Sequence, residues 1–180
     1  MSQQSGVALN KLGHHTEAAE IHRHLLHSYG AHAGADHPRT LISRNNLAEA
    51  INELGQHHEA AEIHRDVLEA RTRVIGPDHP HTLLSRHNLA EALTGLGCHA
   101  EAIGLFIQVL NERTQLLGPS HPDTQLSQEK LTQAANHLHQ PWWRQRRKRR
   151  RDSRRYPRTP SLIDRKDRDR NLPPRKTSVR

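Results

Sequence analysis

The chain has 180 residues, a formal net charge of +8 and only 3% aromatic residues. It has no apolar run of about 18 residues or more, and its N-terminus is polar, so we expect neither a membrane span nor a secretory signal. The single cysteine, Cys98, excludes an internal disulfide and a thiolate zinc cluster, and we expect a soluble, cytoplasmic protein.

The charge is divided unevenly along the chain. Residues 1–140 contain 10 Lys and Arg against 15 Asp and Glu, which gives a net charge of −5. Residues 141–180 contain 17 Lys and Arg against 4 Asp, which gives +13. All 17 histidines lie in the first part. This asymmetry predicts an acidic folded domain followed by a basic interaction tail.

A sequence repeat with a period of 42 residues organises the first part. Gly34–Pro38 recurs as Gly76–Pro80 and Gly118–Pro122, and Asn46–Ala50 recurs as Asn88–Ala92. About half the positions of the two complete units are identical. Such a repeat is typical of a solenoid, in which one structural unit is stacked on the next.

Each unit contains two stretches of helical periodicity. In the first stretch, Leu47, Ala48, Ile51 and Leu54 form an apolar stripe, and Gly55 ends it as a C-terminal glycine commonly does. Small residues along the helices let neighbours approach closely. In chain order, we predict helices over about residues 4–12, 16–30, 39–54, 58–74, 81–96, 100–116 and 123–138.

The second helix of the unit carries its own stripe, made of Ala60, Ile63, Val67, Leu68 and Arg71. Two such helices cannot bury their apolar faces alone, whereas stacked pairs can. The fold class that we expect is therefore an all-α solenoid, with residues 140–180 as a disordered Arg-rich tail.

The repeat resembles the tetratricopeptide repeat, specifically the 42-residue, kinesin-light-chain-like type. The resemblance rests on Asp78-His79-Pro80 followed by Thr82 and Leu83, on the run 85–92, on the Leu-Gly pairs and on the Val-Leu-x-x-Arg ending at Arg71. The His- and Arg-rich composition is similar to that of such proteins from high-GC actinobacteria. The resemblance implies a right-handed superhelix whose concave face binds peptides or partner domains.

The repeat boundaries divide the expected array, residues 1–139, into a partial unit over 1–33, complete units over 34–75 and 76–117, and a terminal half-unit over 118–139. The last helix is more polar than the others and is expected to act as a cap. The clipped first unit leaves an open end, through which we expect that copies of the chain could associate.

The candidate peptide-binding residues lie beside the apolar stripe on the first helix of each unit. They are Arg44, Asn45, Asn46, Glu49, Asn52, Arg86, His87, Asn88 and Glu91. An amide both donates and accepts hydrogen bonds, so it suits an extended peptide backbone. The alternative is structural: the asparagines and arginines tie neighbouring helices together.

The histidines invite a metal hypothesis, but their spacing argues against it. Equivalent histidines are separated by one unit, roughly 10 Å for packed helices, whereas zinc requires three or four ligands around one point. The sequence also shows no nucleophile elbow, phosphate loop or dinucleotide motif. We expect no metal, no cofactor and no enzymatic activity.

The tail supports three hypotheses: nucleic-acid binding, attachment to an acidic protein or to the acidic domain itself, and an extension without a selected role. For the first, arginines would neutralise phosphates and aromatic rings would stack on bases. The residues concerned are Trp142, Trp143, Arg144, Arg146, Arg147, Lys148, Arg149, Arg150 and Arg151.

Overall fold

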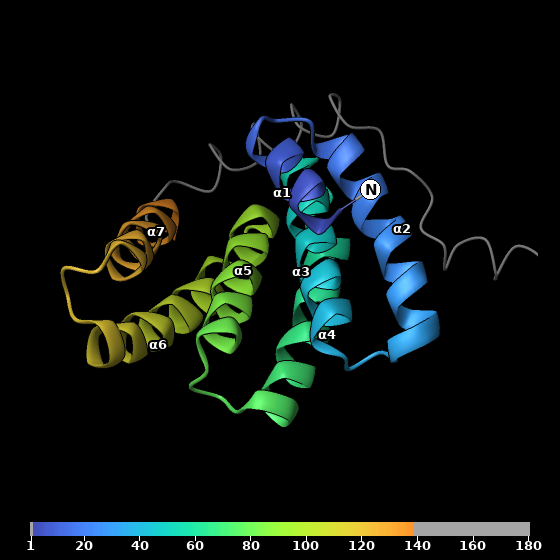
Figure 1. The fold of residues 1–180 in the computed structure, drawn as a ribbon. Helices are drawn as coiled ribbons and strands as arrows, with labels where there is room; N and C mark the ends of the chain where they lie inside the picture. Colours follow the sequence, from blue (N-terminus) through green and yellow to red (C-terminus); the bar gives the residue numbers. More distant parts are fainter. Residues whose placement is uncertain (1, 139–180) are drawn as a thin grey trace, which may run out of the picture. The chain divides into compact units, whose positions relative to one another are not determined.

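The computed structural model describes residues 2–138, which form seven α-helices and no strand in that range (Figure 1). The helices are α1 (Gln3–Lys11), α2 (His15–Ala33), α3 (Pro38–Glu53), α4 (His57–Ile75), α5 (Pro80–Leu96), α6 (His99–Leu117) and α7 (Pro122–Leu138). All seven predicted helices are confirmed. None of the helices in the described part of the chain could span a membrane.

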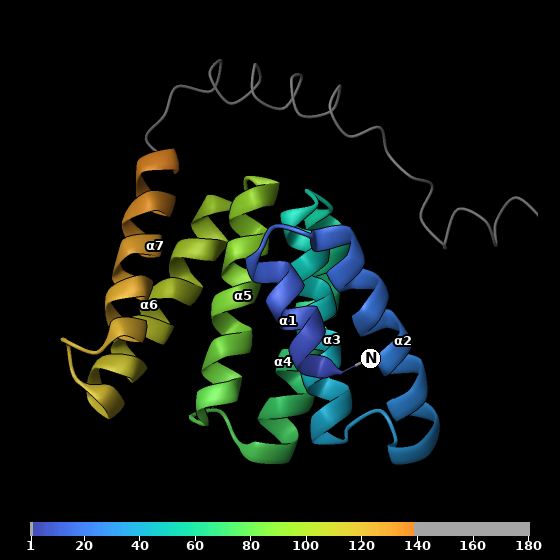
Figure 2. The same cartoon turned by 45° about the horizontal axis from the view of Figure 1, so that its top comes forward.

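The helices stack in chain order, and the stack is curved. Each helix packs against the next one, and α1, α3, α5 and α7 also contact one another in sequence (Figure 2). The described helices α2, α4 and α6 do not approach one another in this way. The first set, here called the inner helices, therefore lines the concave side of the array, and the second set, the outer helices, lines its convex side.

Glycine ends the inner helices where the sequence predicts it. Gly55 and Gly97 have φ angles of 80° and 79°, in the left-handed region that glycine adopts without strain. The next amide then turns back to the helix: Gln56 N donates to the carbonyl of Ile51 at 3.1 Å, and Cys98 N to that of Leu93 at 2.9 Å. These reversals place each outer helix antiparallel to its inner helix.

The histidine of the repeated His-Pro pair caps the next inner helix. The Nδ1 atoms of His37, His79 and His121 accept hydrogen bonds from the backbone amide two residues further on, at 3.2, 3.1 and 3.2 Å. The proline that follows each histidine occupies the first helical turn, where a missing N–H costs nothing. These histidines therefore act as helix caps at the turns between units.

Small residues allow the helices to pack closely. Ala18, Ala60 and Ala102, which are 42 residues apart on successive outer helices, are completely buried. Ala48 and Ala90 are equally buried on the inner helices. Alanine favours helix and loses no side-chain entropy on burial, so a core built on it needs few aromatic residues.

A buried arginine joins each complete unit to the next one. Arg71, which is only 3% exposed at the end of α4, donates to the carbonyl of His81 at 2.8 Å and to Ser85 Oγ at 2.7 Å. Burial lowers the pKa of Arg71 to about 10, which still leaves it charged at neutral pH. The sequence placed Arg71 on the apolar stripe, and the structure shows why a charged residue is tolerated there.

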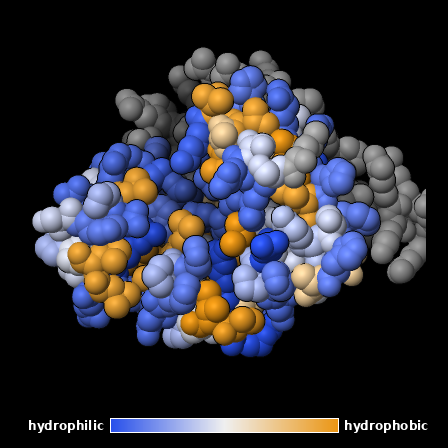
Figure 3. Space-filling model, viewed as in Figure 1, coloured by the Kyte–Doolittle hydropathy of each residue, from blue (hydrophilic) through white to orange (hydrophobic). Residues whose placement is uncertain are grey.

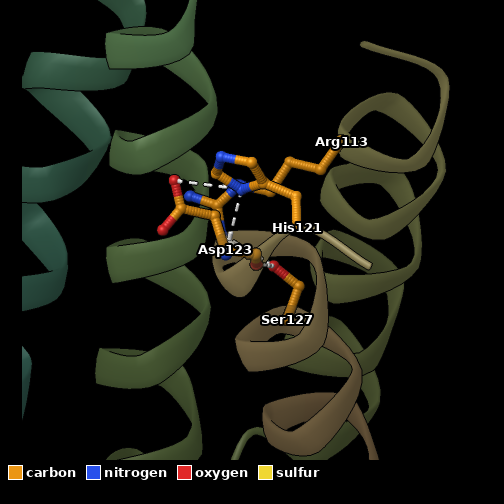
Figure 4. Close-up of polar contacts among 4 residues, drawn as sticks. All are labelled: Arg113, His121, Asp123 and Ser127. Carbon is orange, nitrogen blue, oxygen red and sulfur yellow. Dashed lines mark hydrogen bonds and ion pairs between the residues drawn. The ribbon is translucent and has the colours of Figure 1, made fainter. Parts of the chain in front are cut away.

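The same arrangement recurs one unit later (Figure 4). Arg113, 5% exposed on α6, donates to the carbonyl of Asp123 at 3.0 Å and to Ser127 Oγ at 2.7 Å at the start of α7. At the first junction the repeat has Tyr29 instead of arginine, and the buried Oγ of Ser43 has no hydrogen-bond partner among the described residues. The first junction therefore lacks the bonds that hold the other two.

Histidine occupies one core position in two of the three outer helices. His22 and His64 are 0% and 1% exposed, and the corresponding residue of α6 is Phe106. Burial lowers the pKa of both histidines, that of His64 to about 4 with a further contribution from Arg71. A neutral imidazole thus stands in for an apolar side chain at this position.

Replacing Arg113 with methionine should destabilise the array by about 2–3 kcal/mol, because the buried hydroxyl of Ser127 and the carbonyl of Asp123 each lose a charged donor. Arg65→Met on the exposed surface of α4 is the matched control and should change stability by less than about 0.5 kcal/mol. Urea unfolding followed by circular dichroism measures both. Equal effects of the two substitutions would rule out the junction role of Arg113.

Replacing His64 with phenylalanine should make the array more resistant to acid. In the unfolded chain this histidine protonates below about pH 6.5, but in the folded chain it protonates only below about pH 4. Between these two pH values the unfolded chain binds a proton that the folded chain does not. The stability present above pH 6.5 is therefore lost as the pH falls from about 6.5 to about 4. At pH 5 the loss from His64 alone is about 2 kcal/mol.

The stability gained by His64→Phe should therefore grow by about 2 kcal/mol between pH 7.5 and pH 5. The exposed His24 provides the matched control, because His24→Gln removes a histidine from the surface and not from the core, and it should not reproduce this gain. A gain of His64→Phe that is the same at both pH values would contradict this account.

Candidate functional site

The concave side of the array contains a cavity of about 190 Å³, here called the inner groove. It is formed by the inner helices α3, α5 and α7, with one residue of α6 at its base. The lining residues are Asn52, Glu53, Glu91, Thr94, Phe106, Lys130, Gln133 and His137. All except Phe106 are polar, so the groove suits a ligand that makes hydrogen bonds and ionic contacts.

Hydrophobic side chains are exposed elsewhere. Figure 3 shows several of them at the ends of α4 and α6 and others over α1. They include Val74 and Ile75 on α4 and Leu116 and Leu117 on α6. The inner groove is therefore distinguished from this edge by its polar character.

An ion pair crosses the inner groove. Lys130 Nζ on α7 lies 2.5 Å from Glu91 Oε1 on α5, and both side chains are about one-third exposed. Burial lowers the pKa of Lys130, but the hydrogen bond to Glu91 and the charges of Glu91 and Glu53 raise it more. The ammonium group is thus held in its charged form.

Three glutamates lie near one another on the inner helices α3 and α5. Glu49 and Glu53 lie one turn apart on α3, and Glu91 is the equivalent of Glu49 one unit later. Burial, followed by the charges of Glu91 and Glu53, raises the pKa of Glu49, while Lys11 of α1 acts in the opposite direction. Partial desolvation thus makes the largest contribution to the raised pKa, and the neighbouring carboxylates add to it.

The predicted arginines face the outer helices. Arg44 donates to Asp66 Oδ2 of α4 at 3.1 Å, and Arg86 donates to Glu112 of α6 in a short ion pair. In each complete unit the arginine therefore binds its inner helix to its outer helix. This geometry corresponds to the structural alternative for these two residues.

The remaining predicted residues divide between the groove and the packing. Asn52 lines the groove and its Oδ1 lies 2.8 Å from His57 Nδ1. Asn88 Nδ2 lies 3.4 Å from Asn45 Oδ1, and both residues are buried between α3 and α5. Asn46 is half-buried on α3.

His87 is buried within the array. Its ring meets that of Phe106 edge to face, with the ring centroids 5.3 Å apart. Burial lowers the pKa of His87 to about 4, so it is neutral at physiological pH. A neutral ring at this depth supports the base of the groove and contributes no charge to it.

Comparisons with known proteins agree with this architecture. Tetratricopeptide-repeat family profiles match residues 40–97 and, in two segments, residues 6–39 and 82–123, which together span about two thirds of the chain. The chain belongs to the tetratricopeptide-repeat family. The comparison with curated proteins gave no match.

Solved structures similar to this tetratricopeptide array are kinesin-light-chain-like. A putative kinesin light chain from Podosopora anserina with nearly identical tetratricopeptide-like repeats is 28% identical, with a TM-score of 0.70, over 76% of this chain and 64% of that one. BtubC (BKLC) from P. vanneervenii has a TM-score of 0.64 at 18% identity, over 97% of this chain and 66% of that one, which shows a shared fold. The array thus spans less than two thirds of the first protein.

Sequence reasoning missed much of the groove lining of this tetratricopeptide array. Glu53 is one turn from the predicted Glu49, and Lys130 and Gln133 follow Asn88 and Glu91 by 42 residues. Carrying the repeat period into α7 would have identified the last two. Treating that helix only as a cap removed them from consideration.

The histidines of the array do not gather into a metal site. Within residues 2–138, no three His, Cys, Asp or Glu residues are placed to share an ion. The stacked pairs are His79 with His81 and His99 with His137, each with ring centroids 5.4 Å apart. The predicted nucleic-acid residues, from Trp142 to Arg151, lie outside the described residues.

Replacing Glu91 with glutamine should lower the pKa of Glu49 toward its ordinary value, because one of the charges that raises it disappears. NMR titration of the Glu49 side-chain carboxyl carbon measures this change. Glu101→Gln on the outer helix α6 is the control and should leave the titration of Glu49 as it is. An unchanged pKa in Glu91→Gln would show that burial alone perturbs Glu49.

Proposed function

We propose that this protein is a non-catalytic adaptor that binds a peptide segment or a partner domain along the inner groove. Tetratricopeptide repeats generally mediate protein–protein interaction, and the proposal applies that role to one surface of this chain. The observation that carries it is the inner groove itself, a polar cavity open to solvent on the concave side.

The groove has the chemistry that an extended peptide needs. The amides of Asn52 and Gln133 line it, and beside their bonds to His57 and Glu129 each keeps a further donor and acceptor for a peptide backbone. The hydroxyl of Thr94 donates to the carbonyl of Ala90 and can accept a bond from a ligand. The predicted residues Asn52, Glu49 and Glu91 belong to this proposed surface. Arg44, Asn45, Asn46, Arg86, His87 and Asn88 are proposed to support it by holding the helices that present it.

The mechanism is preorganisation. The buried alanines and the junction arginines fix the inner helices, so the groove side chains need little further ordering when a ligand arrives. Folding already orders these side chains, so binding costs little further conformational entropy. A larger share of the contact energy therefore contributes to affinity.

A blocking substitution tests the proposal. Gln133→Trp places a large ring at the exposed wall of the groove, so we expect proteins captured by the full chain from nuclease-treated lysate to be lost. Gln108→Trp introduces the same change at an exposed position of the outer helix α6 and should retain them. Quantitative mass spectrometry of the captured proteins measures both.

Two results would contradict the proposal. If both tryptophan variants retain the same proteins, the inner groove is not the binding surface. If the proteins are captured only from untreated lysate, are lost after nuclease treatment and are unaffected by either substitution, the basic segment 141–180 carries the interaction, as the nucleic-acid hypothesis predicts.

A further inference from the structure

The charges that surround the inner groove define which ligands it favours. From α3 come Glu49 and Glu53, and from α5 comes Glu91. The neighbouring inner helices supply Lys11 on α1 and Lys130 on α7. The carboxylates therefore outnumber the ammonium groups on the concave side.

The two lysines leave part of this negative charge uncompensated. Lys130 is engaged by Glu91 at 2.5 Å. Among the described residues, neither Glu49 nor Glu53 forms a hydrogen bond or an ion pair through its side chain. Both residues are exposed on one face of α3, although neighbouring atoms partly desolvate the carboxylate of Glu49, and both remain available to a ligand.

Two arginines of the inner helices, which could have attracted an acidic ligand, point instead to the outer helices. Arg44 and Arg86 are neutralised by Asp66 and Glu112 on the outer helices. An acidic peptide entering the groove would meet carboxylates and would have to displace Glu91 from Lys130. A cationic side chain would instead find two unpaired carboxylates.

We propose that the inner groove selects an extended peptide segment that carries arginine or lysine, with the cationic side chain bound between Glu49 and Glu53. This inference rests on the proposed function, because it names the class of ligand for the same groove. Residues one turn apart on a helix are separated by about 6 Å at Cβ, which a guanidinium group can bridge. Arginine is the better ligand because its several donors can serve two carboxylates at once.

The raised pKa of Glu49 agrees with this assignment. The carboxylate is destabilised first by desolvation and then by the charges of Glu91 and Glu53, and a bound cation would offset that repulsion. The rest of the segment would lie against the amides of Asn52 and Gln133. The ionic contact thus supplies selectivity and the amides supply a backbone-binding surface.

Matched peptide probes test the inference on the full chain. The probes are short fluorescent Gly-Ser peptides that carry two arginines, two citrullines or two glutamates, and citrulline keeps the shape of arginine without its charge. We expect the arginine probe to bind about tenfold more tightly than the citrulline probe in fluorescence anisotropy at near-physiological salt. The glutamate probe measures how strongly a peptide is attracted to the basic segment 141–180. This segment is unchanged in every variant.

The double variant Glu49→Gln with Glu53→Gln should abolish the preference for arginine over citrulline. Glu59→Gln with Glu69→Gln removes the same charge from exposed positions of the outer helix α4 and should keep that preference. Circular dichroism of each variant confirms that the helices are intact. A preference that survives the inner double variant overturns the inference.

The outcomes distinguish this inference from the proposed function. If arginine and citrulline probes bind equally and both are lost in Gln133→Trp, the groove binds peptides but does not select cations, so only the inference fails. If the arginine preference is lost equally in both double variants, the attraction is a property of net charge and the inference fails. The lysate capture with the two tryptophan variants decides the proposed function independently.

Discussion

The close approach of helices at small residues is the constraint on which the structure depends. Ala18, Ala60 and Ala102 are completely buried at equivalent positions of the outer helices, and Ala48 and Ala90 at those of the inner helices. A larger side chain at any of these positions would have to displace a neighbouring helix in a core that packs like a crystal. Because the spacing is repeated every 42 residues, the same separation is repeated along the stack, and the inner helices come together on one side.

The unequal junctions give the array a gradient of interactions along its length. Arg71 and Arg113 bind the start of the next inner helix, whereas the first junction has Tyr29 and leaves Ser43 Oγ without a partner among the described residues. Buried histidines are likewise confined, in the outer helices, to α2 and α4, and Phe106 replaces them in α6. Since each unit of a solenoid contacts only its neighbours, local differences of this kind produce local differences in stability. The inner groove lies at the better-bonded end.

The fold could be predicted from the sequence because its determinants are local and repeated. Each determinant acts over a few residues, as do the apolar stripe of Leu47 and Ile51, the terminal Gly55 and the capping His79. Because the repeat brings the same pattern back every 42 residues, each pattern is easier to recognise. The site was predicted less completely, because the direction of a side chain depends on what lies opposite. Arg44 and Arg86 turn to Asp66 and Glu112, partners 22 and 26 residues away that helical periodicity alone does not select. Lys130 meets Glu91 only because α7 stacks on α5.

The central claim is that partners are bound along the inner helices and not on the convex side. Carboxyl footprinting by mass spectrometry tests this most directly, with the full chain labelled in the presence and absence of a captured partner. The account predicts that the partner protects Glu53 in the groove and leaves the exposed Glu59 of the outer helix α4 as reactive as before. Protection of Glu59 with Glu53 unchanged would contradict it and would place the binding surface on the other side of the array.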